Sequence, residues 1–354
     1  MRYLFKDVLE DKVRIKPVDE KLYEKIKLNW DRVSKPINGF GKFENIYSKI
    51  GAIQGEEKAD LEHMRLIVCC GDHGVVSEGV SQTDQSVTRI CAENIGKKLT
   101  TAGVMAASMD IDVMAVDVGI NYDGEINAVV NKKVKKGTNN FLHESAMSVE
   151  EFIEAVQVGM DLVLESKESG YTMILMGEMG IGNTTSAAVM AGYLLQLGAE
   201  TVTGRGAGLD DEGLSKKRAV VSMALSMYGE LSPVEVMARF GGLELAAMTG
   251  IVLGGALYQV PVVLDGMLSM VSALVADRIL DGAKDYLIPS HKSMEPVTEK
   301  LAKKLNLSPV IDGGMALGEG TGAVMMTSLL KLSAVAYNDA LKFKESGVDQ
   351  YKRF

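Results

Sequence analysis

Two glutamates stand beside glycines in segments that carry almost no other charge. Glu178 belongs to MGEMGIGNTTSAA at 176–188, and Glu319 belongs to DGGMALGEGTGA at 312–323. Glycine lets a backbone approach a bound ligand closely, and burial there raises the pKa of a carboxyl above its usual value of about 4.3. Such a carboxyl can act as a general base near neutral pH. The alternative for Glu319 is a carboxylate that only caps a helix.

Glycine is concentrated in four segments of the chain: 70–82, 176–188, 203–209 and 312–323. The second segment follows a predicted strand and opens a predicted helix, which Asn183, Thr184 and Thr185 are placed to cap. The start of a helix offers N–H groups and the positive end of the helix dipole, both of which suit phosphate. Each loop alone is as readily a tight turn as a ligand site. Four together favour a ligand site at the carboxyl ends of the strands.

Neither standard phosphate-binding motif fits these loops. GEMGIGN at 177–183 lacks the Lys-Ser/Thr ending of a Walker A loop, which disfavours ATP hydrolysis. GRGAG at 204–208 lacks the third glycine of the dinucleotide motif, and no acidic residue follows cleanly about 20 positions later. An NAD-linked oxidoreductase is therefore disfavoured.

Histidine and cysteine do not indicate a metal site. The chain has four histidines, and neither His73 nor His291 has a second histidine at ligand spacing. Both are predicted to fix loops by hydrogen bonds, and no metal is predicted. Ser186 and Ser290 lack the G-x-S-x-G pattern of a hydrolase nucleophile.

Short apolar runs that end in glycine or aspartate alternate with helical patterns. The runs predict buried parallel strands at 64–72, 110–119, 172–177 and 260–266. The helical patterns lie at 87–102, 148–168, 186–197, 214–228 and 267–276. This alternation predicts an α/β fold with a parallel sheet covered on both faces. Further helical patterns at about 8–33 and 324–343 predict a small helical domain (1–50 with 324–354) beside a large α/β domain (51–323).

The uncharged stretch at 245–264 has about the ~20 residues that a membrane-spanning helix needs. Gln259 and Pro261 interrupt it, and VPVVLDG at its end is typical of a buried strand. A core helix followed by a core strand is therefore the favoured interpretation.

Composition narrows the class of protein. The 354 residues are 47% hydrophobic and 24% charged, which is ordinary for a folded protein. The formal net charge is −9, and the sequence has no row of basic residues that could bind the phosphates of a nucleic acid. The first residues lack the apolar core of a signal peptide, and three cysteines make no disulfide framework. A cytoplasmic protein is predicted, without a membrane or nucleic-acid partner.

A series of motifs, in order along the chain, resembles the family of nicotinate-nucleotide–dimethylbenzimidazole phosphoribosyltransferases, which assemble the nucleotide loop of cobamides. The resemblance runs from about Lys35-Pro36 to Thr321-Gly322-Ala323. It rests on Asp72-His73-Gly74-Val75, Gly177-Glu178, Gly180, Asn183-Thr184-Thr185, Gly241-Gly242, Met248-Thr249-Gly250, Leu264-Asp265-Gly266, Ile288-Pro289-Ser290-His291 and Leu317-Gly318-Glu319-Gly320.

The resemblance implies a Rossmann-like α/β domain, a helical domain formed by both termini, and a homodimer. It implies transfer of ribose 5-phosphate from nicotinate mononucleotide to an aromatic base without cofactor or metal, giving nicotinate and an α-ribotide. Glu319 corresponds to the general base, and Glu178 to a second acidic residue that stabilises positive charge on the ribose. The substrate-binding residues implied are Gly180, Asn183, Thr184, Gly204, Lys217, Ser293, Leu317 and Gly318.

The chain departs from the family around the expected base pocket. Where the family has a serine and then a glutamine, counting from Asp72 gives Thr83 and Cys91 here, and Phe40 and Phe43 stand where leucines are usual. A less polar, more aromatic pocket suits a phenol such as p-cresol, which some two-subunit relatives activate. The acceptor is thus predicted to be 5,6-dimethylbenzimidazole or a phenol. The alternative is a non-catalytic or weakly active partner subunit, in a heterodimer with a paralogue that activates phenols.

Overall fold

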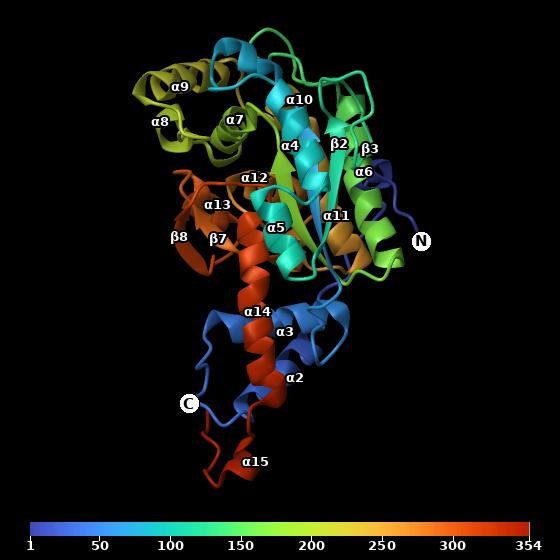
Figure 1. Ribbon diagram of the computed structural model, residues 1–354, viewed down its shortest axis with the longest axis vertical. Coiled ribbons are helices and arrows are strands. Elements are labelled where there is room, and N and C mark those ends of the chain that lie inside the picture. The colour runs from blue at the N-terminus through green and yellow to red at the C-terminus, as the bar shows by residue number, and fades with distance from the viewer. Residues whose placement is uncertain (354) are drawn as a thin grey trace.

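The computed structural model describes residues 1–353 and is built around one six-stranded parallel sheet (Figure 1). Its strands are β1 (Met64–Gly71), β2 (Asp112–Gly119), β3 (Val129–Asn131), β4 (Met173–Met179), β5 (Val262–Val263) and β6 (Leu287–Ile288). They lie in the order β3-β2-β1-β4-β5-β6. The strand order therefore reverses its direction between β1 and β4, where open α/β sheets bind ligands. The predicted fold class is confirmed.

Helices cover both faces of the sheet, so alternate strand residues enter different cores. Ile67 and Cys69 of β1 pack into the core that contains α6 (Val149–Glu168) and α11 (Leu243–Tyr258). Leu66 and Val68 pack into the opposite core, with α3 (Lys42–Gln54), α4 (Ser86–Gly96) and α14 (Thr321–Asp339). Burial on both faces explains why the predicted strands are apolar without alternation.

The stretch at 245–264 forms α11 and then β5, as predicted. Every residue of α11 is buried, and a helix that is apolar all round belongs in a core. Glycines bring α11 against α6: a side chain at Gly159 or Gly250 would collide with the backbone of the other helix. Among the described residues, no helix is long and apolar enough to cross a membrane.

The single helix predicted at 87–102 is wrong, because the structure divides it into α4 and α5 (Thr101–Ser108). Lys98 adopts a left-handed conformation with a φ of 59°, which ends the first helix. The Thr100 hydroxyl then accepts a hydrogen bond from the Gly103 N–H and caps the second helix. The break places the N-terminus of α5 near the loop that carries Glu319.

A helical layer lies beyond one end of the sheet (Figure 1). It contains α2 (Glu20–Asp31), α3, the C-terminal half of α14 and α15 (Phe343–Ser346). Trp30, Tyr47 and Tyr337 pack together inside it, with ring centroids 4.6–5.7 Å apart. The first helix, α1 (Phe5–Leu9), instead packs on α6. The division into 1–50 with 324–354 against 51–323 stays a prediction.

The remaining elements are a small second sheet, further helices and short 3-10 turns. A second sheet pairs β7 (His291–Ser293) with β8 (Ile311–Met315) in parallel. The remaining helices are α7 (Asn183–Leu195), α8 (Ala199–Val202), α9 (Asp211–Ser226), α10 (Pro233–Phe240), α12 (Met267–Ile279) and α13 (Thr298–Lys304), with 3-10 turns at Gly74–Glu78 and Ala283–Tyr286.

Candidate functional site

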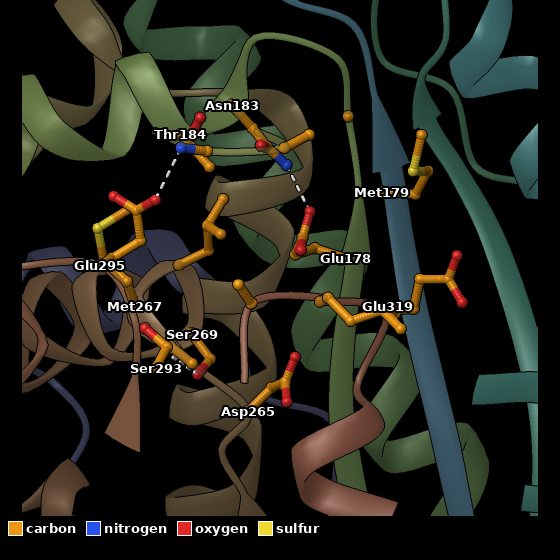
Figure 2. A pocket seen from close by; sticks show the side chains of 18 of the residues that line it. Glu178, Met179, Asn183, Thr184, Asp265, Met267, Ser269, Ser293, Glu295 and Glu319 are labelled. Atoms are coloured by element: carbon orange, nitrogen blue, oxygen red, sulfur yellow. Dashed lines mark hydrogen bonds between the residues drawn. The ribbon is translucent and has the colours of Figure 1, made fainter. Parts of the chain in front are cut away.

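The carboxyl ends of β4 and β5 open into a cavity whose walls come from distant parts of the chain (Figure 2). The segments 178–184, 265–269 and 316–319 contribute to it, together with residues of β7 and the loop at 206–207. Most of the predicted site residues line this cavity: Glu178, Gly180, Asn183, Thr184, Ser293, Leu317, Gly318 and Glu319.

Glu178 lies at the end of β4, with only 8% of its surface exposed. The Asn183 side chain donates a hydrogen bond to its carboxyl (Figure 2). Burial raises the pKa of Glu178 to about 8, and the negative charges of Asp265 and Glu244 add to the effect. The predicted rise is thus present at Glu178, and a carboxyl with this pKa is mostly protonated at pH 7.

Glu319 belongs to a tight loop that precedes α14. Gly318, Glu319 and Gly320 all have positive φ angles, of 86°, 58° and 88°. The loop passes directly over Gly177, where any side chain would collide with the Glu319 carbonyl. The partly buried carboxylate accepts a 3.4 Å hydrogen bond from the Ala102 N–H in the first turn of α5. Glu319 thus contacts the start of a neighbouring helix while still lining the cavity.

A cluster of donors lies on the opposite side of the cavity. Lys217 of α9 is buried, and its ammonium donates a 2.7 Å hydrogen bond to the Thr184 hydroxyl. Burial lowers the pKa of Lys217 to about 8, partly opposed by the charge of Glu295. The Glu295 carboxylate accepts a 2.9 Å hydrogen bond from the Gly206 N–H and lies against Gly204. Lys217 and Gly204 therefore stand just behind the cavity wall.

The structure does not bring Thr83 to this cavity. Thr83 is exposed in the loop before α4. Cys91 is partly buried on α4, and burial together with the charge of Glu319 raises the pKa of its thiol. Cys91 is therefore a neighbour of Glu319, although neither Thr83 nor Cys91 lines the cavity itself. The roles of both residues in base binding stay predictions.

The predicted side-chain cap of α7 is wrong. The N-cap residue is Gly182, which has a φ of 96° and makes no side-chain hydrogen bond to the helix. The side chains of Asn183 and Thr184 bind Glu178 and Lys217 instead. Tertiary contacts across the cavity have replaced the local cap that sequence alone suggested.

His73 fixes a loop by hydrogen bonds, as predicted, whereas His291 lines the cavity. The His73 ring lies 2.8 Å from the Ser186 hydroxyl and 2.6 Å from the Glu244 carboxylate, and all three side chains are buried. His291 lies 3.5 Å from the Asp265 carboxylate. No cluster of potential ligands for a metal ion occurs within residues 1–353.

Sequence reasoning missed the roles of Asp265, Glu244 and Glu295 around the cavity. Asp265 closes a predicted strand, which is a signal that could have found it, because ligand sites gather where parallel strands end. Glu244 and Glu295 lie within apolar or unpatterned segments, and only the folded contacts reveal them.

Comparison with known proteins assigns the chain to a family. A phosphoribosyltransferase family model matches residues 15–348. The nicotinate-nucleotide–dimethylbenzimidazole phosphoribosyltransferase of Ruminiclostridium cellulolyticum is 34% identical, over 96% of this chain and 97% of its own length. That of Chlorobaculum tepidum is 36% identical, over 94% and 96%.

A solved structure agrees with these sequence relatives. CobT from Thermus thermophilus superposes with a TM-score of 0.87 at 36% identity, covering 94% of this chain and all of that one. The chain therefore belongs to the nicotinate-nucleotide–dimethylbenzimidazole phosphoribosyltransferase family and is an enzyme of the pentosyltransferase type.

Proposed function

We propose that this enzyme transfers ribose 5-phosphate from nicotinate mononucleotide to the aromatic base that becomes the lower ligand of a cobamide. The observation that carries the proposal is the meeting of Glu178 and Glu319 at one cavity, opposite the donors around Lys217. The relatives' names support the same reaction.

In the proposed reaction, a nitrogen of the benzimidazole, or the hydroxyl oxygen of a phenol, attacks the anomeric carbon of the ribose from the face opposite nicotinate. The bond from that carbon to the pyridinium nitrogen breaks, and its electron pair neutralises the pyridinium. Glu319 accepts the proton that the base loses. A general base contributes ~10²- to 10⁴-fold in rate, and placing the two substrates face to face contributes much of the rest.

Glu178 stabilises the positive charge that develops on the ribose. Its pKa of about 8 keeps it mostly neutral in the empty enzyme. The positively charged pyridinium of the bound substrate favours the ionised carboxylate and so lowers this pKa on binding. The substrate thereby creates the charge that stabilises the transition state.

The phosphate and nicotinate portions lie among Gly180, Gly204, Lys217 and Ser293, with Asn183 and Thr184 at the start of α7 beside them. Leu317 and Gly318 cover the base. The N-terminus of α7 and the ammonium of Lys217 both favour an anion.

Replacing Lys217 with methionine should weaken binding of nicotinate mononucleotide by ~10- to 100-fold at pH 7, because a charged hydrogen bond to phosphate is lost. The native pKa of about 8 adds a pH signature. Above pH 8 the free ammonium loses its proton, so native affinity falls by up to about tenfold per pH unit. Calorimetric titrations between pH 6.5 and 9.5 measure both effects.

The control is Lys216→Met, which removes an exposed ammonium from the same helix. It should leave the affinity and its pH dependence unchanged. An alkaline loss of affinity that persists in Lys217→Met would show that another group causes it.

The acceptor base is either 5,6-dimethylbenzimidazole or a phenol. The test is a turnover assay on the purified chain, supplied with nicotinate mononucleotide and either dimethylbenzimidazole, adenine or p-cresol. The ribotide products are detected by mass spectrometry. Preferred turnover of p-cresol supports the altered pocket at Thr83 and Cys91, and a clear benzimidazole preference contradicts it. No product with any base favours the alternative of a partner subunit without activity of its own.

We also propose that the chain forms a dimer in the cytoplasm, with a second copy or with a paralogue. Exposed apolar side chains line one side of α14: Met325, Leu329, Leu332 and Val335, between 36% and 69% exposed. A second chain would remove this stripe from water. Light scattering of the purified chain should give twice the mass of the monomer, and Leu332→Glu should reduce the measured mass to that of the monomer. A native monomer would favour the paralogue as partner.

A further inference from the structure

Asp265 holds the start of α14 from outside the helix. It lies at the end of β5, and only 4% of its surface is exposed. One carboxylate oxygen accepts a 2.8 Å hydrogen bond from the Gly322 N–H, and the other accepts a 3.1 Å bond from the Gly320 N–H. The two oxygens thus bind backbone groups immediately after Glu319.

The loop that Asp265 holds is conformationally demanding. Glu319 has a positive φ between two glycines that also have positive φ. A residue with a Cβ occupies this region only where its surroundings impose it. Two surrounding features do so: the Asp265 carboxylate, and Gly177, over which the loop passes closely.

Asp265 also influences the second acidic residue. Burial is the main cause of the raised pKa of Glu178, and the negative charge of Asp265 raises it more than the charges of Glu244 and Glu319 do. His291 of β7 lies 3.5 Å from Asp265, and the Ser290 hydroxyl donates to the Asp265 carbonyl. The buried Asp265 carboxylate therefore binds the loop that carries Glu319. Its negative charge also acts on Glu178.

We propose that Asp265 is a positioning residue of the transfer reaction, which fixes the backbone that carries Glu319 and keeps a negative charge beside Glu178. This inference rests on the proposed function for its kinetic part. Asp265 also lines the cavity, and the role proposed for it is exerted through the two glutamates.

The test is Asp265→Asn, which keeps the shape of the side chain but removes the charge and one acceptor. We expect kcat to fall by ~10- to 100-fold, with the KM for nicotinate mononucleotide changed less than about threefold, because a displaced base impairs chemistry more than binding. The acid limb of kcat/KM, which follows ionisation of Glu178, should move to lower pH by on the order of one unit. The control is Asp312→Asn, at an exposed aspartate of β8.

Two further measurements separate positioning from general damage to the fold. In a Glu319→Gln background, Asp265→Asn should have less than about a threefold effect on kcat, because residues that act as a unit are not additive. Hydrogen exchange followed by mass spectrometry should be faster across 316–323 in Asp265→Asn and unchanged across β1.

The outcomes are distinguishable from those of the proposed function. Absence of turnover by the native chain contradicts the proposed function, and hydrogen exchange still decides whether Asp265 holds the loop. Unchanged exchange across 316–323 would overturn the inference. The inference would also be overturned if Asp265→Asn left the acid limb of kcat/KM unmoved and lowered kcat by the same factor in the Glu319→Gln background as in the native protein.

Discussion

Glu319→Gln will lower kcat by ~10²- to 10⁴-fold, because glutamine keeps the size of the side chain but cannot accept a proton. Its amide oxygen can still accept the hydrogen bond from the Ala102 N–H, so the contact with α5 is retained. The KM for nicotinate mononucleotide should change little, since the donors around Lys217 lie on the opposite side of the cavity. Steady-state kinetics with product detection by mass measures both constants.

The acidity of the acceptor provides an internal check on this prediction. A base that loses its proton more readily depends less on a general base, so the loss should shrink as more acidic benzimidazoles or phenols are supplied. The control is Glu154→Gln, at an exposed glutamate of α6. A loss of the same size with every acceptor would contradict proton transfer to Glu319 and favour a purely structural effect.

What the sequence predicted depended on local signals. Continuous apolar runs predicted four central strands, because parallel strands covered on both faces need apolar side chains throughout. Glu178 and Glu319 were recognisable because each is flanked by glycine, and both line the cavity. The strands β3, β6, β7 and β8 lack the longer apolar run that marks β5, which is also short.

What escaped prediction depends on contacts between distant residues. The role of Asp265 depends on hydrogen bonds from Gly320 and Gly322, which lie 55 and 57 positions later in the chain. The break between α4 and α5 depends on the turn at Lys98, within a pattern otherwise compatible with one helix. Thr83 was placed by counting along a motif, and a count carries no information about which loop residues face a cavity.

Glu178→Gln should make the empty protein more stable at alkaline pH and less active at every pH. A pKa raised from 4.5 to about 8 means that the folded state holds a proton that the unfolded chain releases between these values. The free energy of unfolding contributed by Glu178 therefore falls as pH rises from about 4.5 to about 8, by at most on the order of 5 kcal/mol. Above pH 8 the buried carboxylate is ionised, and its full cost is present.

Glutamine removes this cost, because it stays neutral while its oxygen can still accept the bond from Asn183. Guanidinium unfolding at pH 5, 7 and 9 should show a stability gain over the native protein that grows with pH, whereas Glu154→Gln should show none. Activity should fall, because the neutral side chain cannot stabilise positive charge on the ribose. A gain that does not grow between pH 5 and 9 would mean that Glu178 is already ionised in the empty enzyme. A growing gain with full activity would separate the buried carboxyl from the reaction, and would leave Glu319 as the only acidic group that the chemistry needs.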